Sequence, residues 1–308
     1  MTVVDVHAHV IVPGLGAEVH WDERGQVVEL GGKAIRAAVR EFVELDKILE
    51  EQDRSGVDRV VLCPWVNLVG RETARQNEGL AALVGPRVSV LGTVDLSRPD
   101  ELVELMGDGR FSGVEVAASD GGDYLGHDRF ADFWAAAEET GALVFVHPTT
   151  RGFGIEALND YYLWNTAGNP LETTITAAHM VMAGVLERHP RLRVLLAHAG
   201  GAILSLRGRL RHSHTFQPDA RARLTESPVD SIRRFYLDTV THDTTLLRAA
   251  IEFAGADRVL VGSDYPFDMG LEQPAEAVRE LGLDPDDEAA ILGGNALRLL
   301  GHGPGAGP

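Results

Sequence analysis

The sequence predicts an α/β protein: a single (β/α)8 barrel of the TIM type, with a lid-like insertion after its first strand. Two observations carry this prediction. Eight short runs of β-branched and aliphatic residues recur along the chain, and segments with helical spacing separate them. Each run is apolar on both faces, as parallel strands covered by helices are. A doubly wound open sheet is the alternative fold with the same alternation.

The first strand is expected at residues 3–9, and seven more follow in order. They are expected at 59–64, 88–96, 113–118, 143–148, 193–201, 235–239 and 259–266. Helical spacing is clearest over residues 42–56, 130–141 and 172–190. Several helical segments close on Gly or Pro, as helices often do. We therefore expect one barrel domain over residues 1–302, followed by a short tail over 303–308.

An insertion is expected over residues 10–42, because this stretch is too long for a simple connection between a strand and a helix. Within it, residues 21–33 (WDERGQVVELGGK) resemble a small hairpin. A segment that directly follows a barrel strand leaves from the C-terminal mouth, where active sites of such barrels are built. The insertion is therefore expected to act as a lid.

The composition argues against several classes of protein. The single cysteine, Cys63, excludes an internal disulfide and a thiolate metal cluster, so a metal would be held by histidine and carboxylate. A formal net charge of −18 argues against nucleic acid or an anionic membrane as the main partner. No apolar run approaches the roughly 20 residues of a membrane span, and residues 1–15 lack the signal-peptide pattern. A cytoplasmic protein is expected.

Polar side chains stand at the expected C-terminal ends of four strands. Strand one ends in His7 and His9, strand five in His147, strand six in His198 and strand eight in Asp264. Residues two apart in a strand point to the same side, so His7 and His9 project together. His7, His9, His147 and Asp264 could therefore converge on one divalent ion with a position left for water. His198 would stand beside that water.

One metal ion per subunit is expected rather than two. Sites with two ions on this type of barrel usually need a bridging ligand, commonly a carbamylated lysine at the end of strand four. The two lysines, Lys33 and Lys47, lie far upstream of that strand. Glu115 lies within strand four and is expected to support a ligand or to edge the core. Asp238 and Asp95 are expected either to orient a ligating imidazole or to cap a strand end.

Four motifs resemble the amidohydrolase superfamily and, more narrowly, its zinc-dependent decarboxylase branch, typified by α-amino-β-carboxymuconate-ε-semialdehyde decarboxylase. They are DVHAHV (5–10), FVHP (145–148), AHAGG (197–201) and GSDYPF (262–267), and the longer stretches 168–202 and 293–301 are similar too. The resemblance implies zinc, with Mn²⁺ as another possible ion, held by His7, His9, His147 and Asp264. It also implies that His198 is the acid/base of the reaction, acting on the metal-bound water.

The resemblance further implies arginines that bind the substrate's carboxylate. Arg36 matches the family's arginine in the lid region, and Arg40 is its rival for that place. Arg209 lies eleven residues after His198 and would reach into the neighbouring subunit's site, which implies a homodimer. A surface salt bridge is the alternative for Arg209. Arginine suits the carboxylate because it binds with two parallel hydrogen bonds.

Aromatic side chains near the expected mouth could stack on a planar substrate. Trp164 follows strand five, and Phe267 comes shortly after Asp264. Core packing is the alternative for both. The segments 159–165 (NDYYLWN) and 263–270 (SDYPFDMG) differ from the typical member of the branch, so the substrate is left open.

The expected function is that of a metal-dependent decarboxylase for a small unsaturated or aromatic carboxylic acid. Zinc lowers the pKa of its bound water to about 7, and the ordinary histidine pKa of about 6.5 lets His198 take or give that proton. Asp264 is expected to be catalytic as well as a ligand. A hydrolase or hydratase could use the same ion, water and base, so this alternative stays open. A metal-binding barrel without catalysis is the second alternative.

Overall fold

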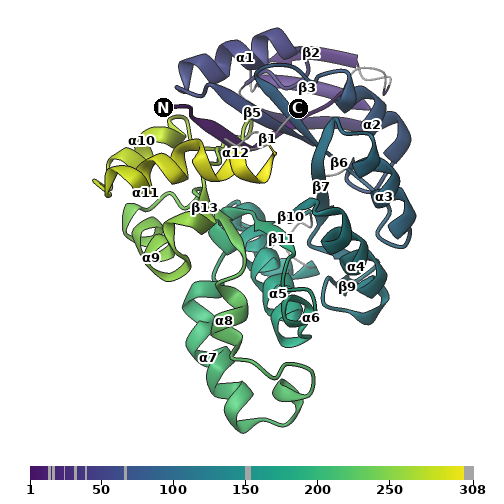
Figure 1. The fold of residues 1–308 in the computed structure, drawn as a ribbon. Helices are drawn as coiled ribbons and strands as arrows, with labels where there is room; N and C mark the ends of the chain where they lie inside the picture. The colour runs from purple at the N-terminus through teal and green to yellow at the C-terminus, as the bar shows by residue number, and fades with distance from the viewer. Residues whose placement is uncertain are drawn as a thin grey trace.

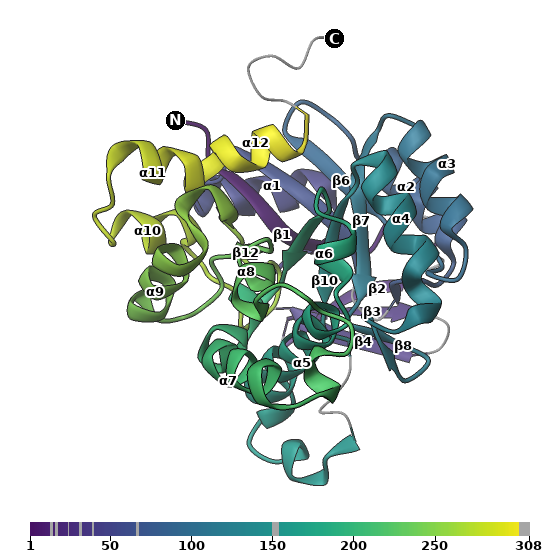
Figure 2. The same cartoon turned by 60° about the horizontal axis from the view of Figure 1, so that its bottom comes forward.

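The computed structural model describes residues 1–12, 15, 18–23, 25–30, 33–38, 40–65, 68–149 and 154–301, without the side chains of residues 30 and 33–38. Eight parallel strands form its central sheet, in an order that follows the chain (Figures 1 and 2). They are β1 (Val4–Val10), β5 (Arg59–Pro64), β6 (Val88–Gly92), β7 (Phe111–Ala117), β10 (Leu143–His147), β11 (Arg193–Leu196), β12 (Tyr236–Asp238) and β13 (Val259–Leu260). All eight predicted strands are thus present.

The sheet closes on itself at the seam between β1 and the chain that follows β13. The Val6 amide donates to the Val261 carbonyl at 2.9 Å, and the His9 amide donates to the Tyr265 carbonyl at 2.7 Å. Ala8 pairs in parallel with Tyr265 at the same seam. An open sheet has two free edges, whereas β1 is paired on both sides. The predicted barrel is therefore confirmed.

Helices surround the barrel on its outside (Figures 1 and 2). They are α1 (Leu45–Arg54), α2 (Thr73–Ala81), α3 (Pro99–Gly107), α4 (Ala131–Thr140), α5 (Asn169–Met182), α6 (Val185–Arg188), α7 (Ile203–Phe216), α8 (Pro228–Ile232), α9 (Thr244–Ala254), α10 (Pro274–Arg279), α11 (Pro285–Ala289) and α12 (Asn295–Leu299). The single helix expected at 172–190 is two helices, α5 and α6, because Gly184 between them has a φ of +72°. A left-handed residue ends an α-helix.

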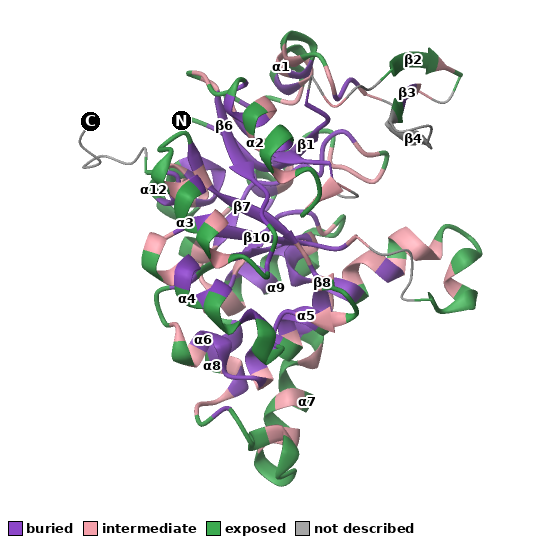
Figure 3. Cartoon of the chain, turned by 90° about the vertical axis from the view of Figure 1, so that its right-hand side faces the viewer, coloured by how far each residue is buried: buried purple, intermediate pink, exposed green. Residues whose placement is uncertain are grey.

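The insertion after β1 forms a small antiparallel sheet of three strands, β2 (Glu18–Asp22), β3 (Gly25–Leu30) and β4 (Lys33–Ala38). The predicted hairpin is present, and β4 adds a third strand that the sequence did not predict. This sheet stands beside the barrel rather than in its wall (Figure 3). Val28 of β3 packs with the buried Ile11, Phe42 and Trp65, which anchors the insertion next to the strand ends.

A short pair, β8 (Ser119–Asp120) and β9 (Asp123–Tyr124), follows β7. Among the described residues, no helix is both long enough and apolar enough to cross a bilayer. The tail expected at 303–308 lies outside the described residues. Burial is concentrated in the barrel wall and in the helix faces turned towards it (Figure 3).

Gly113 in β7 allows close contact between two neighbouring strands and provides a test of the barrel. A Cβ atom at this position would lie 1.9 Å from the Leu143 carbonyl oxygen of β10. We expect Gly113→Ala to lower the free energy of unfolding by about 3 kcal/mol, because β7 and β10 must move apart. Chemical denaturation measures the change. Gly107→Ala is the matched control, since its Cβ would meet nothing within 4 Å, and an equal loss in both variants would contradict the prediction.

Candidate metal centre

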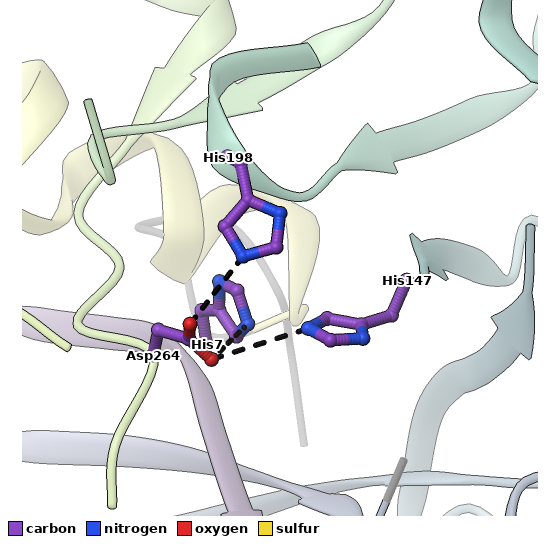
Figure 4. Close-up of side chains that lie close together, drawn as sticks. All are labelled: His7, His147, His198 and Asp264. Atoms are coloured by element: carbon purple, nitrogen blue, oxygen red, sulfur yellow. Dashed lines mark hydrogen bonds and ion pairs between the residues drawn. The ribbon is translucent and has the colours of Figure 1, made fainter. Parts of the chain in front are cut away.

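Three imidazoles and one carboxylate, those of His7, His147, His198 and Asp264, lie together at the C-terminal end of the barrel (Figure 4), and the imidazole of His9 lies beside the same carboxylate. Asp264 Oδ1 lies 3.1 Å from His7 Nε2, 3.7 Å from His9 Nε2 and 3.9 Å from His147 Nε2. The other carboxylate oxygen, Oδ2, lies 3.3 Å from His198 Nε2. The expected meeting of these five side chains is thus found in the structure. They come from β1, β10, the turn after β11 and the segment after β13.

Backbone carbonyls orient two of the imidazoles. His9 Nδ1 lies 3.0 Å from the Pro64 carbonyl oxygen, and His147 Nδ1 lies 2.8 Å from the Pro148 carbonyl oxygen. A carbonyl can only accept a hydrogen bond, so Nδ1 carries the hydrogen in both rings. In the neutral ring Nε2 then has a free lone pair. Both Nε2 atoms therefore face Asp264 as possible ligands.

The buried carboxylate of Asp238 orients the third imidazole, that of His7. Asp238 Oδ2 lies 2.7 Å from His7 Nδ1, so Nδ1 donates and Nε2 is again left as the ligand atom. Burial alone would raise the pKa of Asp238, but the bond from His7, the charges of His7 and His198 and the bond from the Ala199 amide together outweigh burial and lower it. The predicted role of Asp238 in orienting an imidazole fits this contact. Asp95 instead accepts hydrogen bonds from the amide and hydroxyl of Ser97, as the residue of a turn does.

These atoms have the arrangement that a single divalent cation needs. In the described part of the chain, Nε2 of His7, His9 and His147 and Oδ1 of Asp264 are buried without a hydrogen-bond partner. Such unpaired polar atoms are costly, and they are rare unless something else satisfies them. Ligand atoms that each lie about 2.0–2.2 Å from one ion are roughly 3–4 Å apart. The distances from Oδ1, 3.1–3.9 Å, fall in this range, so the residues fit a divalent ion.

His198 differs from the other three histidines. Its ring is not anchored through Nδ1, which is buried without a hydrogen-bond partner among the described residues. Its backbone has a φ of +55°, and that of the next residue, Ala199, is +50°. Asp238 holds this left-handed turn by accepting hydrogen bonds from the His198 amide at 3.0 Å and the Ala199 amide at 2.7 Å. Strained backbone of this kind persists where the surrounding structure fixes it, often at functional sites.

The charges in the cluster are strongly coupled. Burial lowers the pKa of His7, but Asp264 and Asp238 outweigh it and raise the value to about 10. Burial likewise opposes protonation of His9, whose pKa is raised to about 9 by Glu115 and Asp264. Burial alone would raise the pKa of Asp264, but His7 and the other imidazoles hold it well below its ordinary value. Without a cation, protons on the imidazoles balance the buried carboxylates.

Two residues next to the cluster, Asp5 and Ser263, were not predicted from the sequence. Asp5 is fully buried and accepts hydrogen bonds from the His7 amide and the Ser263 amide, each at 3.0 Å. These bonds tie β1 to the segment that carries Asp264. Burial raises the pKa of Asp5 to about 6. The signal available in the sequence was a carboxylate two residues before His7 in the first strand.

Aromatic side chains form one wall of the cluster. The ring of Phe267 lies 5.4 Å from that of His9 and 5.0 Å from that of Trp65. Trp65 is stacked on Phe42 with 4.8 Å between ring centroids. The predicted position of Phe267 beside the centre fits these contacts. Trp65 was missed, although it directly follows the strand at 59–64, where a residue of the mouth is expected.

Trp164 belongs to a segment that is joined to the loop carrying Asp264. Its ring packs edge-on against Tyr162 at 5.0 Å. The Tyr162 hydroxyl donates to Asp268, with its oxygen 3.0 Å from Oδ1. The segments after β10 and β13, both unusual in sequence, therefore contact each other. Trp164 itself is half-buried.

The three candidate arginines lie in different places. The Arg40 guanidinium lies 5.7 Å from the centroid of the Tyr265 ring. Tyr265 directly follows Asp264 in the sequence. Arg36 belongs to β4 and pairs with Val27 of β3, but its side chain lies outside the described residues. Arg209 is exposed on α7, a helix that projects from the barrel (Figure 1).

A family model for amidohydrolases matches residues 4–302, which is nearly the whole chain. The chain belongs to the amidohydrolase family. The match spans every strand of the barrel and includes His7, His9, His147, His198 and Asp264. The resemblance inferred from the sequence motifs is thereby confirmed.

Two curated relatives of this amidohydrolase are named as decarboxylases. One is 2-amino-3-carboxymuconate-6-semialdehyde decarboxylase of Dictyostelium discoideum, 30% identical over 62% of this chain and 54% of the relative. The other is 6-methylsalicylic acid decarboxylase of Penicillium expansum, 34% identical over 47% of this chain and 45% of the relative. The matched part thus spans about half the length of these relatives.

The barrel also matches a solved structure along nearly its entire length. The crystal structure of 5-carboxyvanillate decarboxylase from Novosphingobium aromaticivorans, complexed with manganese and 4-hydroxy-3-methoxy-5-nitrobenzoic acid, superposes with a TM-score of 0.81. The match covers 97% of this chain and 96% of that one at 16% identity. At this identity, the likeness concerns the fold.

The pKa values of the imidazoles predict how cation binding depends on pH. In the metal-free protein at pH 7, His7 and His9 are protonated, because their pKa values are about 10 and about 9. A divalent ion binds only the unprotonated nitrogen, so binding should release about two protons per ion and weaken as the pH falls. Titration calorimetry with Zn²⁺ in buffers of different ionisation enthalpy measures the release. Heats independent of the buffer would contradict the prediction.

Proposed function

We propose that this amidohydrolase is a metal-dependent decarboxylase for a small unsaturated or aromatic carboxylic acid. The observation that supports this most is a set of buried Nε2 atoms around Asp264 Oδ1 that have no hydrogen-bond partner among the described residues. Beside them lies His198, whose Nδ1 is not held by an oxygen of the described residues. The metal centre alone would serve a hydrolase or hydratase equally well. The names of the two relatives and of the matching structure, all decarboxylases, favour loss of carbon dioxide.

The proposed ligands are His7, His9, His147 and Asp264, which would hold one divalent ion per subunit. Zinc suits three imidazoles and a carboxylate, and the manganese in the matching structure makes Mn²⁺ the other candidate. When bound, the ion supplies a concentrated positive charge that offsets the buried carboxylates and polarises an oxygen of the substrate. The oriented Nδ1 atoms keep the three ligand nitrogens aimed at one point.

His198 is the proposed acid/base. Decarboxylation exchanges a carboxylate for a proton on the same carbon, and the electron pair left by carbon dioxide needs a conjugated acceptor. Protonation of the substrate before the bond breaks creates that acceptor. His198 Nε2 faces Asp264 Oδ2 at 3.3 Å, which turns this nitrogen towards the proposed centre, and Nε2 would leave that contact to give its proton to the substrate. Its unanchored Nδ1 leaves both tautomers accessible.

The substrate is proposed to lie against the aromatic wall of Phe267, with Trp164 near the mouth. A planar acid suits such a wall, because flat rings stack with little loss of conformational freedom. Arg40 or Arg36 would bind a carboxylate of the substrate. Arg209, exposed on α7, would enter the neighbouring subunit's site if the protein is a homodimer, as we propose. The sheet β2–β4 is the proposed lid, and the cytoplasm the proposed location.

Substitution of His198 separates catalysis from metal binding. We expect His198→Ala to retain its metal and to lose activity by about 10²–10⁴-fold, because it removes only the proton carrier. His147→Ala should lose metal and activity together, since it removes a ligand. Metal content by plasma emission spectroscopy and carbon dioxide release are measured on the same samples. His127→Ala, at an exposed histidine before α4, is the control.

The proposed reaction is tested by measuring carbon dioxide release from a panel of unsaturated and aromatic carboxylic acids. The panel contains 2-amino-3-carboxymuconate-6-semialdehyde, 6-methylsalicylic acid and 5-carboxyvanillate, each offered to the Zn²⁺ and Mn²⁺ forms. Carbon dioxide release from at least one acid is expected, and chelation of the metal should abolish it. Addition of water to a panel member without release of carbon dioxide would redirect the proposal to a hydrolase or hydratase.

In the substitution experiment, full activity of the His198→Ala variant would contradict the acid/base role of His198.

A further inference from the structure

A second carboxylate lies behind the proposed ligands and belongs to neither the ligand set nor the acid/base pair. Glu115 is in β7, a strand of the barrel wall that Figure 3 shows as largely buried, and it pairs in register with Phe145 of β10. It is 0% exposed. Neither of its carboxylate oxygens has a hydrogen-bond partner among the described residues. A buried carboxylate left in this state is unfavourable, so a group nearby must compensate for it.

The nearest such group is the imidazole of His9. Glu115 Oε2 lies 3.6 Å from His9 Nδ1, on the side of the ring turned away from Asp264. The Pro64 carbonyl oxygen lies 3.0 Å from the same nitrogen. The Nδ1 hydrogen therefore faces two oxygens at once. A small rotation of the ring would move this hydrogen from the carbonyl to the carboxylate.

Unlike Asp238, Glu115 does not hold the backbone in place. Asp238 backs His7 but also accepts hydrogen bonds from the amides of His198, Ala199 and Val240. It is therefore needed for the shape of the chain as well as for its ligand. Glu115 has no such bonds to the described backbone. The side chain is placed to act on His9 and on a cation beyond it, rather than to hold the fold.

We infer that Glu115 is a positioning residue that backs His9 and thereby sets how tightly the centre holds a divalent cation. A carboxylate behind a ligating imidazole fixes the ring's orientation and increases the basicity of the ligand nitrogen. Two of the three imidazoles would then have a carboxylate behind them, Asp238 for His7 and Glu115 for His9. Nδ1 of His147 instead has the Pro148 carbonyl oxygen as its hydrogen-bond acceptor. The inference rests on the proposed metal centre.

Glu115→Gln tests this inference, because it keeps the shape of the side chain and removes the carboxylate. We expect its dissociation constant for Zn²⁺, measured by competition with a chromophoric chelator, to rise by about 10–100-fold. The visible absorption of the Co²⁺ form should change as well, since the orientation of His9 alters the ligand field. Thermal unfolding of the metal-free variant should occur at no lower temperature than that of the wild type.

Cys63→Ala is the matched control. Cys63 is buried in the same barrel interior, where burial together with the charges of Glu115 and Asp5 raises the pKa of its thiol. Its substitution disturbs the packing there without removing a carboxylate, and we expect its affinity for Zn²⁺ to stay within about twofold. Equal weakening in both variants would mean that packing sets the affinity, which would overturn the inference.

The remaining outcomes are also decisive. Wild-type affinity and an unchanged Co²⁺ spectrum in Glu115→Gln would overturn the inference and leave the proposed function standing. A wild-type protein that binds no Zn²⁺ or Mn²⁺ would overturn the metal centre itself. If Glu115→Gln does not fold, Glu115→Asp replaces it, because its shorter side chain withdraws the oxygens from His9. Weaker binding in that variant supports the inference, and unchanged binding overturns it.

Discussion

The site depends on the buried carboxylate of Asp238 at the end of β12. It accepts hydrogen bonds from the ring of His7 and from the amides of His198, Ala199 and Val240. One side chain therefore joins the ends of β1, β11 and β12, and it fixes two functions at once. It presents His7 Nε2 as a ligand atom, and it stabilises the left-handed turn that aims His198 at Asp264.

Barrel closure brings the two ends of the chain together. His7 and His9 lie on the first strand, whereas Asp264 follows the last, and the hydrogen bonds across the seam place them side by side. Asp5 adds a second link across the same seam through Ser263. The result is a mouth where carboxylates and imidazoles are buried at close range. Such a group of charges is stable only when protons or a cation balance them, and this gives a divalent ion its favourable place.

Much of the fold follows from local sequence patterns. Short runs rich in β-branched, aliphatic and aromatic residues mark the eight barrel strands, because a strand covered on both faces is mostly apolar. Local patterns were insufficient where longer-range packing decides. The strand β4 has little apolar alternation and forms by pairing with β3. The break between α5 and α6 depends on the left-handed backbone of Gly184, which contacts the segment around Arg223. Trp65 gains its place from stacking on Phe42.

The sequence by itself determined the barrel and the five side chains at its mouth, because the ends of parallel strands are recognisable from their residues and must share one rim. Only the tertiary structure decided how those side chains are held. The sequence does not reveal that Nδ1 of three histidines faces an oxygen, whereas Nδ1 of His198 has no hydrogen-bond partner among the described residues. Nor does it reveal that Glu115 lies behind His9 and has no hydrogen-bond partner in the described part of the chain. These features depend on contacts between residues far apart in the chain, and such contacts arise only when the barrel has closed.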